Sequence, residues 1–359
     1  MTSFPRLIDT ISQRLESFSA AQGAATTGLG DEAEGFVAQA AAALAGGKRL
    51  RGRFCATGWR AVSGGREVPA SVVDACASLE VFQAAALVHD DLIDNSDTRR
   101  GRPSAHRALE AWHIDAGWTG DAAAFGRAGS VLLGDLLLSW SADLFDAALA
   151  LLDAPTARAR AEYGRMRREV MVGQFLDVAE ESAWPRTPAH EHAGRALRIA
   201  SLKSARYSVQ QPLVIGGSLA DGDEDQLASL ADIGHPLGLA FQLRDDVLGV
   251  FGDERETGKP AGDDLREGKR TLLIAYAREA AGTSAREEID ALLGDRLLDD
   301  DEIDALRDTI VATGALSRVE DLITAYADEA GLALSSARFD ADAASELQAL
   351  VEAATRRRS

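Results

Sequence analysis

The strongest constraint on the fold of this chain is its helical periodicity. Apolar residues recur at three- and four-residue spacing over long stretches, as one buried face of an α-helix requires. The stretches are Ala38–Leu44, Val72–Leu92, Val131–Leu151, Ala196–Ile215 and Leu227–Val250. We find no convincing run of alternating β-branched residues. The pattern predicts an all-α fold of ten or more helices.

Glycine pairs punctuate the helical stretches, and each predicts a turn. Examples are Gly46-Gly47, Gly64-Gly65 and Gly216-Gly217. The acidic, amphipathic segment from Glu288 to Thr355 is expected to form helices that pack around the outside. We therefore predict a single domain over residues 1–359, with a main body at about 35–330 and a C-terminal helical tail at 331–359.

The charge of the chain argues against one class of partner. The sequence has 57 acidic residues against 38 Lys and Arg, which gives a formal net charge of −19. Nucleic acid is not expected as the main partner, because phosphate binding needs a positive surface. Any anionic substrate has to be attracted by local clusters of Lys and Arg, since the overall field is negative.

Several features favour a cytoplasmic protein. Cys55 and Cys76 lie in apolar helical contexts and are expected to be buried free thiols. The first residues, Met1 to Gly23, have polar interruptions where a signal peptide has a continuous apolar core. No stretch approaches 18 uninterrupted apolar residues, so we expect no membrane span.

Two acid-rich segments stand at the ends of apolar helical runs. They are His89-Asp90-Asp91-Leu92-Ile93-Asp94 and Arg244-Asp245-Asp246-Val247-Leu248-Gly249. Asp90 and Asp94 share a helix face, where like charges four residues apart repel by roughly 0.2–0.5 kcal/mol. A hard divalent cation with oxygen ligands neutralises such pairs. Ordinary surface acids would not explain the apolar residues between them, so the segments predict metal sites.

Clusters of cations lie near both acidic segments. The first segment continues into Asn95–Gly101, which contains a double arginine on a predicted turn. The second is followed by the Gly-punctuated loop Gly258–Arg270, which could instead be an ordinary charged surface loop. A third cluster, Gly46–Arg51, joins two helices and could by itself be a solvated junction. Backbone amides at a helix start together with Lys and Arg bind anions, so the clusters predict a metal–diphosphate clamp.

Two smaller features are compatible with this interpretation. Gln174 and Asp177 lie three residues apart on one predicted helix. Lys203-Ser204 interrupts an otherwise apolar helical stretch. A lone lysine on such a face more often extends its charged end to water than takes part in catalysis, so the role of Lys203 stays open at this level.

Taken together, these residues resemble the trans-isoprenyl diphosphate synthases (polyprenyl synthetases) over about residues 35–330. The shared motifs are Gly-Gly-Lys-Arg-x-Arg, Asp-Asp-x-x-Asp with Arg-Arg-Gly, Gly-Gln-x-x-Asp, Lys-Ser, and Phe-Gln-x-x-Asp-Asp with its Gly-Lys loop. One of them could arise by chance, but all occur in the family's order. The resemblance implies the isoprenoid synthase fold, an all-α bundle around a deep central cavity, and a homodimer.

The resemblance also implies a reaction. Members of the family condense isopentenyl diphosphate head-to-tail with an allylic diphosphate and depend on Mg²⁺, here expected as three ions per active site. The two acidic segments are expected to face each other across the cavity mouth. The departing diphosphate is the expected acceptor of the proton, since the sequence offers no obvious histidine base.

The family's functional residues can be transferred to this chain by position. Asp90, Asp94 and Asp245 are then metal ligands, with Asp91 and Asp246 in support and Asp177 and Gln174 near the metals. The allylic diphosphate would contact Arg99, Lys203, Lys259 and Lys269, with Ser204 and Gln242 close by. Isopentenyl diphosphate would contact Lys48, Arg51, Gln83 and Arg100. The residues expected to be catalytic are Asp90, Asp91, Asp94, Arg99, Lys203, Asp245 and Lys259.

The chain departs from the family's pattern at three positions. Gly249 stands where the second acidic motif usually has its third Asp, and Asp253 follows one turn later. Gln83 stands where many members have His. Gly52 replaces a common Pro, with no expected effect on the reaction. The Gly249 departure affects the detail of the second metal site.

Product length in this family depends on side-chain bulk below the first acidic motif. Ala85 and Ala86 lie one helical turn below Asp90 and are small. Phe82 lies two turns below, roughly 12 Å at 1.5 Å per residue. We expect the alanines to let the product pass the C15 stage and Phe82 to stop it, which favours geranylgeranyl diphosphate. Farnesyl or longer products remain possible, because a side chain from another helix could be the one that stops elongation.

The sequence argues against three other functions. A class I terpene cyclase shares the fold but needs a different second metal motif and no second diphosphate site, which Lys48, Arg51 and Arg100 argue against. A non-catalytic subunit of a heteromeric prenyl synthase tends to lose acidic motifs that are nearly whole here. A purely structural helical protein has no reason to keep both cation clusters.

Overall fold

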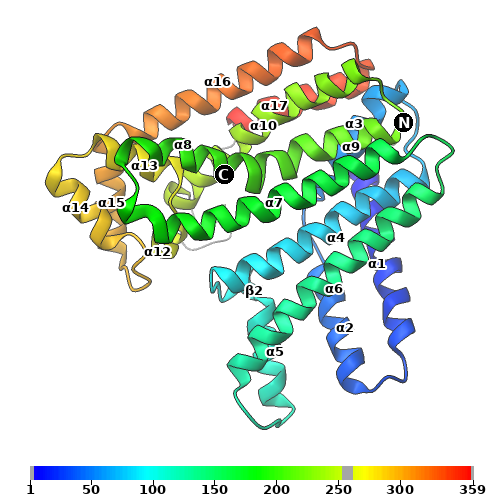
Figure 1. The fold of residues 1–359 in the computed structure, drawn as a ribbon, viewed down its shortest axis with the longest axis horizontal. Helices are drawn as coiled ribbons and strands as arrows, with labels where there is room; N and C mark the ends of the chain where they lie inside the picture. The colour runs from blue at the N-terminus through cyan, green and yellow to red at the C-terminus, as the bar shows by residue number, and fades with distance from the viewer. Residues whose placement is uncertain (1–3, 253–261, 357–359) are drawn as a thin grey trace. The chain divides into compact units, whose positions relative to one another are not determined.

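Helices dominate the part of the chain that the structure, a computed structural model, describes, residues 4–252 and 262–356 (Figure 1). The predicted all-α fold is confirmed, and these residues form more than ten helices. The only sheet among them is a short antiparallel hairpin of β1 (Thr98–Arg99) and β2 (Arg102–Pro103). The sequence pattern gave no sign of these two-residue strands.

The chain divides into two compact units. The first consists of the described parts of Met1–Arg60 and of Arg66–Thr156, and the second of Ala61–Gly65 and the described parts of Ala157–Ser359. The single domain expected over 1–359, with its body at 35–330 and its tail at 331–359, stays a prediction.

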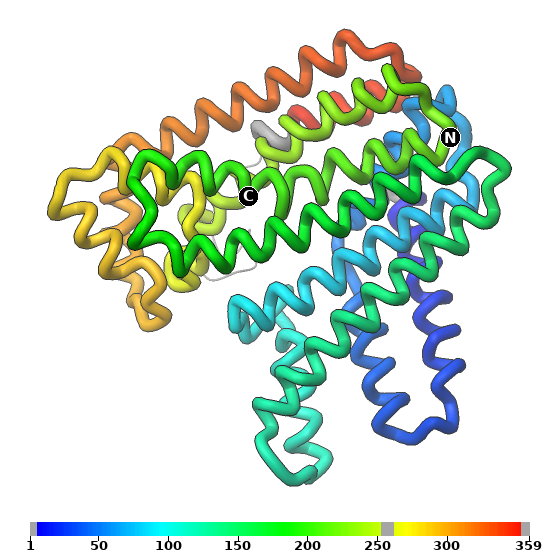
Figure 2. Tube along the Cα trace, in the orientation of Figure 1, coloured from blue at the N-terminus to red at the C-terminus, as the bar shows by residue number. Residues whose placement is uncertain are grey.

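The first unit contains six helices and the hairpin among its described residues. The helices are α1 (Phe4–Thr26), α2 (Asp31–Ala43), α3 (Leu50–Ser63, whose last residues belong to the second unit), α4 (Ala70–Ile93), α5 (Ala105–Asp115) and α6 (Ala122–Ala150). Within this unit α1 lies beside α2, and α4 packs along α6, as the tube in Figure 2 shows.

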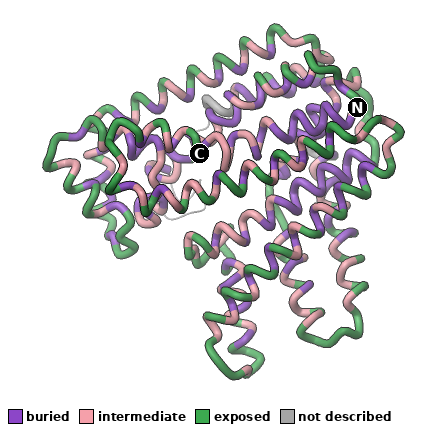
Figure 3. The backbone as a smooth tube through the Cα atoms, viewed as in Figure 1, coloured by how far each residue is buried: buried purple, intermediate pink, exposed green. Residues whose placement is uncertain are grey.

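Helix α4 forms the centre of the first unit. It is apolar around most of its circumference, and a helix of this kind is normally buried on all sides. It is coloured as buried over most of its length in Figure 3. Ser78 on α4 and Ser141 on α6 each donate a hydroxyl hydrogen bond to the other's backbone oxygen, at 2.8 and 2.7 Å. These bonds satisfy two buried hydroxyls and set the register between the helices.

The second unit is larger. Its elements are α7 (Ala157–Ala183), the short 3₁₀ helix η1 (Trp184–Arg186), α8 (Ala189–Ile199), the π-helix η2 (Ala200–Gln210), α9 (Gln211–Leu219), α10 (Glu224–Phe251), α12 (Asp263–Glu267), α13 (Leu272–Ala280), α14 (Thr283–Leu292), α15 (Asp300–Ala312), α16 (Ala315–Ser336) and α17 (Ala341–Arg356). Helix α10 packs against η2 and α16, and α7 packs against η2 and α9.

One predicted turn is wrong. Gly216 and Gly217 lie inside α9 and are buried. A Cβ on Gly217 would come within 2.5 Å of a Leu230 methyl and 2.8 Å of a Leu227 methyl. The glycine is therefore needed for close helix packing and not for a turn, a distinction that requires knowing the tertiary contact.

The cysteine prediction is confirmed, because Cys55 and Cys76 are both buried free thiols. Two helices, α4 and α6, are long and apolar enough to cross a membrane by length and composition alone. The most apolar part of α4 is 83% buried and that of α6 is 28% buried. A buried core helix passes the same test, so burial in the protein explains why α4 is so apolar.

Candidate active site

The first acidic motif occupies the last turn of α4. Asp94 ends the helix, and its backbone N–H donates to the Asp90 carbonyl at 2.8 Å. The Asp90 side chain keeps 21% of its surface exposed, whereas Asp91 is almost fully buried. The two neighbouring acids therefore differ in role: Asp90 can reach a ligand in solution, and Asp91 faces the protein.

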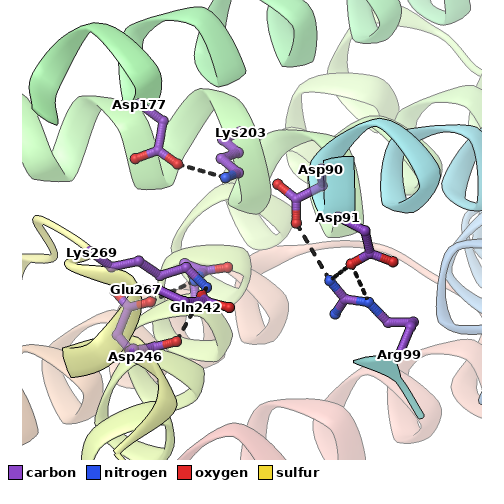
Figure 4. Close-up of polar contacts among 10 residues, drawn as sticks. Asp90, Asp91, Arg99, Asp177, Lys203, Gln242, Asp246, Glu267 and Lys269 are labelled. Carbon is purple, nitrogen blue, oxygen red and sulfur yellow. Dashed lines mark hydrogen bonds and ion pairs between the residues drawn. The ribbon is translucent and has the colours of Figure 1, made fainter. Parts of the chain in front are cut away.

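The Asp91 carboxylate forms an ion pair with Arg99. The Arg99 Nε donates to Asp91 Oδ1 at 2.8 Å, and its guanidinium Nη2 makes a second, shorter contact to the same oxygen (Figure 4). The Asp90 carboxylate lies 3.7 Å from Arg99. Burial raises the pKa of Asp91, and the Arg99 guanidinium opposes this rise. Asp91 thus fixes Arg99 beside Asp90.

The hairpin places the double arginine. Arg99 pairs with Arg102, and the turn residues Arg100 and Gly101 have φ of 54° and 71°. Two left-handed residues make the tight two-residue turn typical of hairpins, which Gly101 adopts at no steric cost. The predicted turn at Arg99-Arg100-Gly101 is confirmed, with Arg99 on the strand and Arg100 at the tip.

The cationic cluster Gly46–Arg51 lies next to Arg100. A Cβ on Gly47, whose φ is 96°, would meet the Arg100 guanidinium at 3.0 to 3.3 Å. Lys48 is exposed and Arg51 is partly buried at the start of α3. Within the first unit, the cluster and Arg100 therefore form one cationic surface, as a diphosphate site requires. Arg49 is different, because it is buried and donates to the Leu44 carbonyl at 2.9 Å.

The residues expected to set product length lie on α4 as predicted. Phe82 and Ala85 are fully buried, while Ala86 and Gln83 are partly exposed. Ala86 therefore keeps part of its surface exposed, whereas Ala85 is fully enclosed. The structure thereby distinguishes two alanines that the sequence treats as equivalent.

In the second unit, Asp177 on α7 and Lys203 on η2 form an ion pair with Oδ2 and Nζ 2.6 Å apart (Figure 4). This contact depends on Gly173, where a Cβ would lie 2.5 Å from the Lys203 backbone nitrogen. Gln174 and Ser204 are partly buried on the same two helices. Lys203 is thus held by a carboxylate and does not simply extend into water.

The second acidic motif lies near the end of α10. Asp245 is exposed, and Asp246 is 9% exposed and accepts a hydrogen bond from the Gln242 amide at 2.7 Å (Figure 4). Burial, with the nearby Asp264 carboxylate as the next cause, raises the pKa of Asp246 to about 7. Asp245 can therefore reach a ligand, whereas Asp246 lies in the protein interior.

Lys269 lies close to this motif and is held by two acids. Its ammonium is 3.2 Å from Asp264 Oδ1 and 2.6 Å from Glu267 Oε2. The structure does not describe Lys259, so its predicted contact with the allylic diphosphate is untested. The sequence segment containing Asp264 and Glu267 was recognised as a charged loop, but these two residues were given no role. Their position a few residues before Lys269 was the sequence signal that they could contact its ammonium.

The predicted metal ligands have the right chemistry but do not form a closed metal cage. Among the described residues, no group of three or more His, Cys, Asp or Glu side chains is close enough to hold an ion. Mg²⁺ commonly binds through one or two carboxylates together with substrate phosphates, and it retains several waters. The reachable carboxylates of Asp90 and Asp245 fit that mode, in which the substrate completes the coordination shell.

Comparison with known proteins agrees with these motifs. Residues 36–310 match the family model for polyprenyl synthetases. The chain belongs to the polyprenyl synthetase family. That membership confirms the family resemblance that the motifs suggested.

Individual relatives of this polyprenyl synthetase extend the match over most of the chain. It is 33% identical to the geranylfarnesyl diphosphate synthase of Aeropyrum pernix, over 80% of this chain and 82% of the relative. It is 28% identical to the geranylgeranyl diphosphate synthase of Saccharolobus solfataricus, over 79% and 78%. A crystal structure of geranylgeranyl pyrophosphate synthase from Corynebacterium glutamicum, complexed with isoprenyl diphosphate and magnesium, is 39% identical and covers 99% of both chains with a TM-score of 0.92. The isoprenoid synthase fold is thereby confirmed.

Proposed function

We propose that this protein condenses isopentenyl diphosphate head-to-tail with an allylic diphosphate and that its main product is geranylgeranyl diphosphate. The observation that carries the proposal is the 39% identity, over 99% of both chains, to a geranylgeranyl pyrophosphate synthase that was crystallised with isoprenyl diphosphate and magnesium. The chain keeps acidic and cationic side chains of the kind that this chemistry needs, in the arrangement described above.

Magnesium is the proposed cofactor, with Asp90, Asp94 and Asp245 as its protein ligands and Asp177 nearby. When bound, Mg²⁺ offsets the negative charge that develops as diphosphate leaves. Arg99 would stabilise the same charge in the first unit, and Lys203 and Lys269 would do so in the second. Each of these cations is oriented by a carboxylate, so little reorganisation is needed when the substrate binds.

Isopentenyl diphosphate is proposed to bind the cationic surface of Lys48, Arg51 and Arg100, with Gln83 nearby. This surface lies in the same unit as Arg99. Arg99 is engaged by Asp91, whereas the Arg100 guanidinium lies against the backbone of Gly47. Neighbouring arginines can therefore serve two different diphosphates.

A homodimer is proposed from the family resemblance and from exposed apolar side chains. Val131 and Leu132 on α6 are 45% and 60% exposed. Met171, Val172 and Phe175 on α7 are 51%, 52% and 69% exposed. Exposed apolar side chains grouped on a helix commonly mark an interface, and a second copy of this chain is the proposed partner.

A panel of allylic starters tests the reaction. Purified protein is incubated with isopentenyl diphosphate, Mg²⁺ and dimethylallyl, geranyl or farnesyl diphosphate, and the dephosphorylated products are separated by chromatography. We expect a linear C20 alcohol. A C25 alcohol would assign the chain the product length of the Aeropyrum relative. A cyclic hydrocarbon would favour a cyclase, and no condensation with any starter would favour a non-catalytic subunit.

A further inference from the structure

Arg244 is the first residue of the second acidic motif, and it is buried where its neighbour Asp245 is exposed. Both lie on α10, and Arg244 is 8% exposed. A buried guanidinium needs a partner of opposite charge, because burying an unpaired charge is strongly unfavourable. The partner comes from α16, which packs beside α10 (Figure 1).

The Arg244 guanidinium forms a two-bond ion pair with Glu320 on α16. Its Nη1 donates to Glu320 Oε1 at 2.5 Å, and its Nη2 donates to Oε2 at 2.7 Å. Two parallel bonds between a planar guanidinium and a carboxylate fix orientation as well as distance. The neighbouring Val319 is fully buried, so the backbone that carries Glu320 is itself packed in place. The pair therefore fixes the rotation of α10 about its own axis at this residue.

The three consecutive charged residues of the motif point in different directions. Successive residues on an α-helix are about 100° apart around the helix axis. Arg244 bonds to α16, and Asp246 is buried and accepts a bond from the Gln242 amide. Asp245 lies between them in the sequence and is exposed. A rotation of α10 that broke the Arg244 pair would therefore also redirect the Asp245 carboxylate.

A second arginine holds the end of α10. The Arg307 Nε, from α15, donates to the Val250 carbonyl at 2.7 Å. Val250 lies in the last turn of α10, where carbonyl oxygens have no partner inside the helix. Contacts from α16 and α15 thus hold α10 on both sides of Asp245 in the sequence.

We propose that Arg244 and Glu320 are positioning residues that direct the Asp245 carboxylate towards magnesium diphosphate. The inference rests on the proposed function, because it takes Asp245 as a metal ligand. Glu320 acts through Arg244, and Arg244 acts through the backbone of α10. Replacing a residue that orients a metal ligand commonly costs about tenfold or more in metal affinity. The pair therefore contributes to binding as well as to stability.

Binding of inorganic pyrophosphate in magnesium chloride tests the proposal. Affinity is measured by calorimetry at a temperature where circular dichroism shows every variant to be folded, so a loss of stability alone leaves the affinity unchanged. Glu320→Gln keeps the shape of the side chain but loses its charge, and it should weaken binding by about tenfold. The control is Glu279→Gln, which removes the partner of Arg318, also on α16, from a more exposed ion pair. This control should bind like wild type.

Two further variants separate orientation from charge. Arg244→Lys keeps the positive charge but cannot form two parallel bonds, so it should also weaken binding by about tenfold. Glu320→Asp restores a carboxylate and should bind pyrophosphate more tightly than Glu320→Gln. Should Glu320→Gln fail to fold, Arg244→Lys still decides the question, because it keeps both charges of the pair.

Wild-type pyrophosphate affinity in Arg244→Lys would overturn the proposal, because that variant keeps the charge and loses only the geometry. An equal loss in Glu320→Gln and Glu279→Gln would also overturn it, since the effect would then not be specific to the Arg244 pair. Wild-type protein that binds no magnesium pyrophosphate would count against the proposed function as well. Binding that none of these substitutions changes would count against this inference alone, so the two failures can be told apart.

Discussion

Two buried carboxylates, Asp91 and Asp246, have different surroundings although each follows a more exposed acid. Asp91 faces the Arg99 guanidinium, whereas Asp246 faces the Gln242 amide and a second carboxylate, Asp264. Burial raises the pKa of both, and only Asp91 has a bonded cation to oppose the rise. At the scale of single residues, Asp91 is therefore an anchor for Arg99, and Asp246 is an acid that is neutral below about pH 7 in the metal-free protein.

Asp91→Asn should misplace Arg99. The amide keeps the shape of the carboxylate but loses the charge, so the Arg99 guanidinium loses a charge-assisted bond worth roughly 1.5–3 kcal/mol. We expect condensation at saturating substrate to fall at least about tenfold and the melting temperature to fall. Asp97→Asn is the control, because Asp97 is 69% exposed and its partner is Arg107. Equal activity in the two variants would contradict the role given to Asp91.

The raised pKa of Asp246 predicts how the stability of the metal-free protein depends on pH. The folded protein keeps this proton up to about pH 7, whereas the unfolded chain releases it near 3.8. The folded state thus binds more protons between these values, so this group makes the free energy of unfolding fall as pH rises through that range. Asp246→Asn should remove this fall in chemical denaturation curves recorded from pH 4 to 7.

Asp245→Asn is the matched control, since it removes the adjacent exposed carboxylate and should keep most of the decline. An unchanged pH slope in Asp246→Asn would show that the buried acid is not its source.

Close packing of the helices around η2 positions Lys203. Gly173 on α7 and Gly234 and Gly238 on α10 each face the backbone of η2, where an added Cβ would come within 2.5 to 2.7 Å of a backbone atom. A π-helix is wider than an α-helix and is often found at functional sites. Glycine on both neighbouring helices leaves room for it, and this packing directs Lys203 towards Asp177.

Gly173→Ala should therefore separate α7 from η2. The added methyl would clash with backbone atoms, which cannot move aside as a flexible side chain does, so both stability and activity should fall. Gly164→Ala, on the same helix, would meet only the end of the Arg168 side chain at 3.2 Å. It should be neutral or stabilising by up to ~1 kcal/mol through helix propensity. Similar melting temperatures for the two variants would contradict the packing argument.

We propose that side chains on helix α4 limit the length of the product. Ala86→Phe should shorten the product from C20 to C15, because Ala86 is only partly buried and the ring can extend from the helix. Ala85→Phe is a poorer test, since Ala85 is fully enclosed and an added ring would overpack the unit. Ala86→Ser is the size control and should keep the C20 product. A C20 product from Ala86→Phe would show that a residue on another helix limits product length.

Periodicity revealed the long helices because their apolar positions follow the 3.6-residue repeat. It could not reveal the hairpin, whose two-residue strands depend on the left-handed turn at Arg100 and Gly101. The motifs also identified Asp90, Lys203 and Asp245, because residue type and order carry their chemistry. They could not indicate that Asp264 lies over Gly249, since that contact joins residues 15 apart through tertiary packing.

The net charge and the exposed apolar residues together affect whether two copies of the chain associate. With a net charge of −19, two copies of the chain repel each other at long range, so a dimer needs a substantial apolar contact. Leu132→Asp should convert the proposed dimer to a monomer in sedimentation experiments, because it puts a charge among exposed apolar residues of α6. Leu29→Asp changes a residue that is 70% exposed outside the helices and is the control. A Leu132→Asp dimer would exclude this face of α6 as the interface.

We propose above that this polyprenyl synthetase makes a C20 product with magnesium as cofactor. The most direct test is mass spectrometry of the dephosphorylated product after full conversion of farnesyl diphosphate and excess isopentenyl diphosphate, with and without a metal chelator. The prediction is geranylgeraniol with Mg²⁺ and farnesol alone with the chelator. Unreacted farnesol under both conditions, or condensation that persists in the chelator, would contradict it.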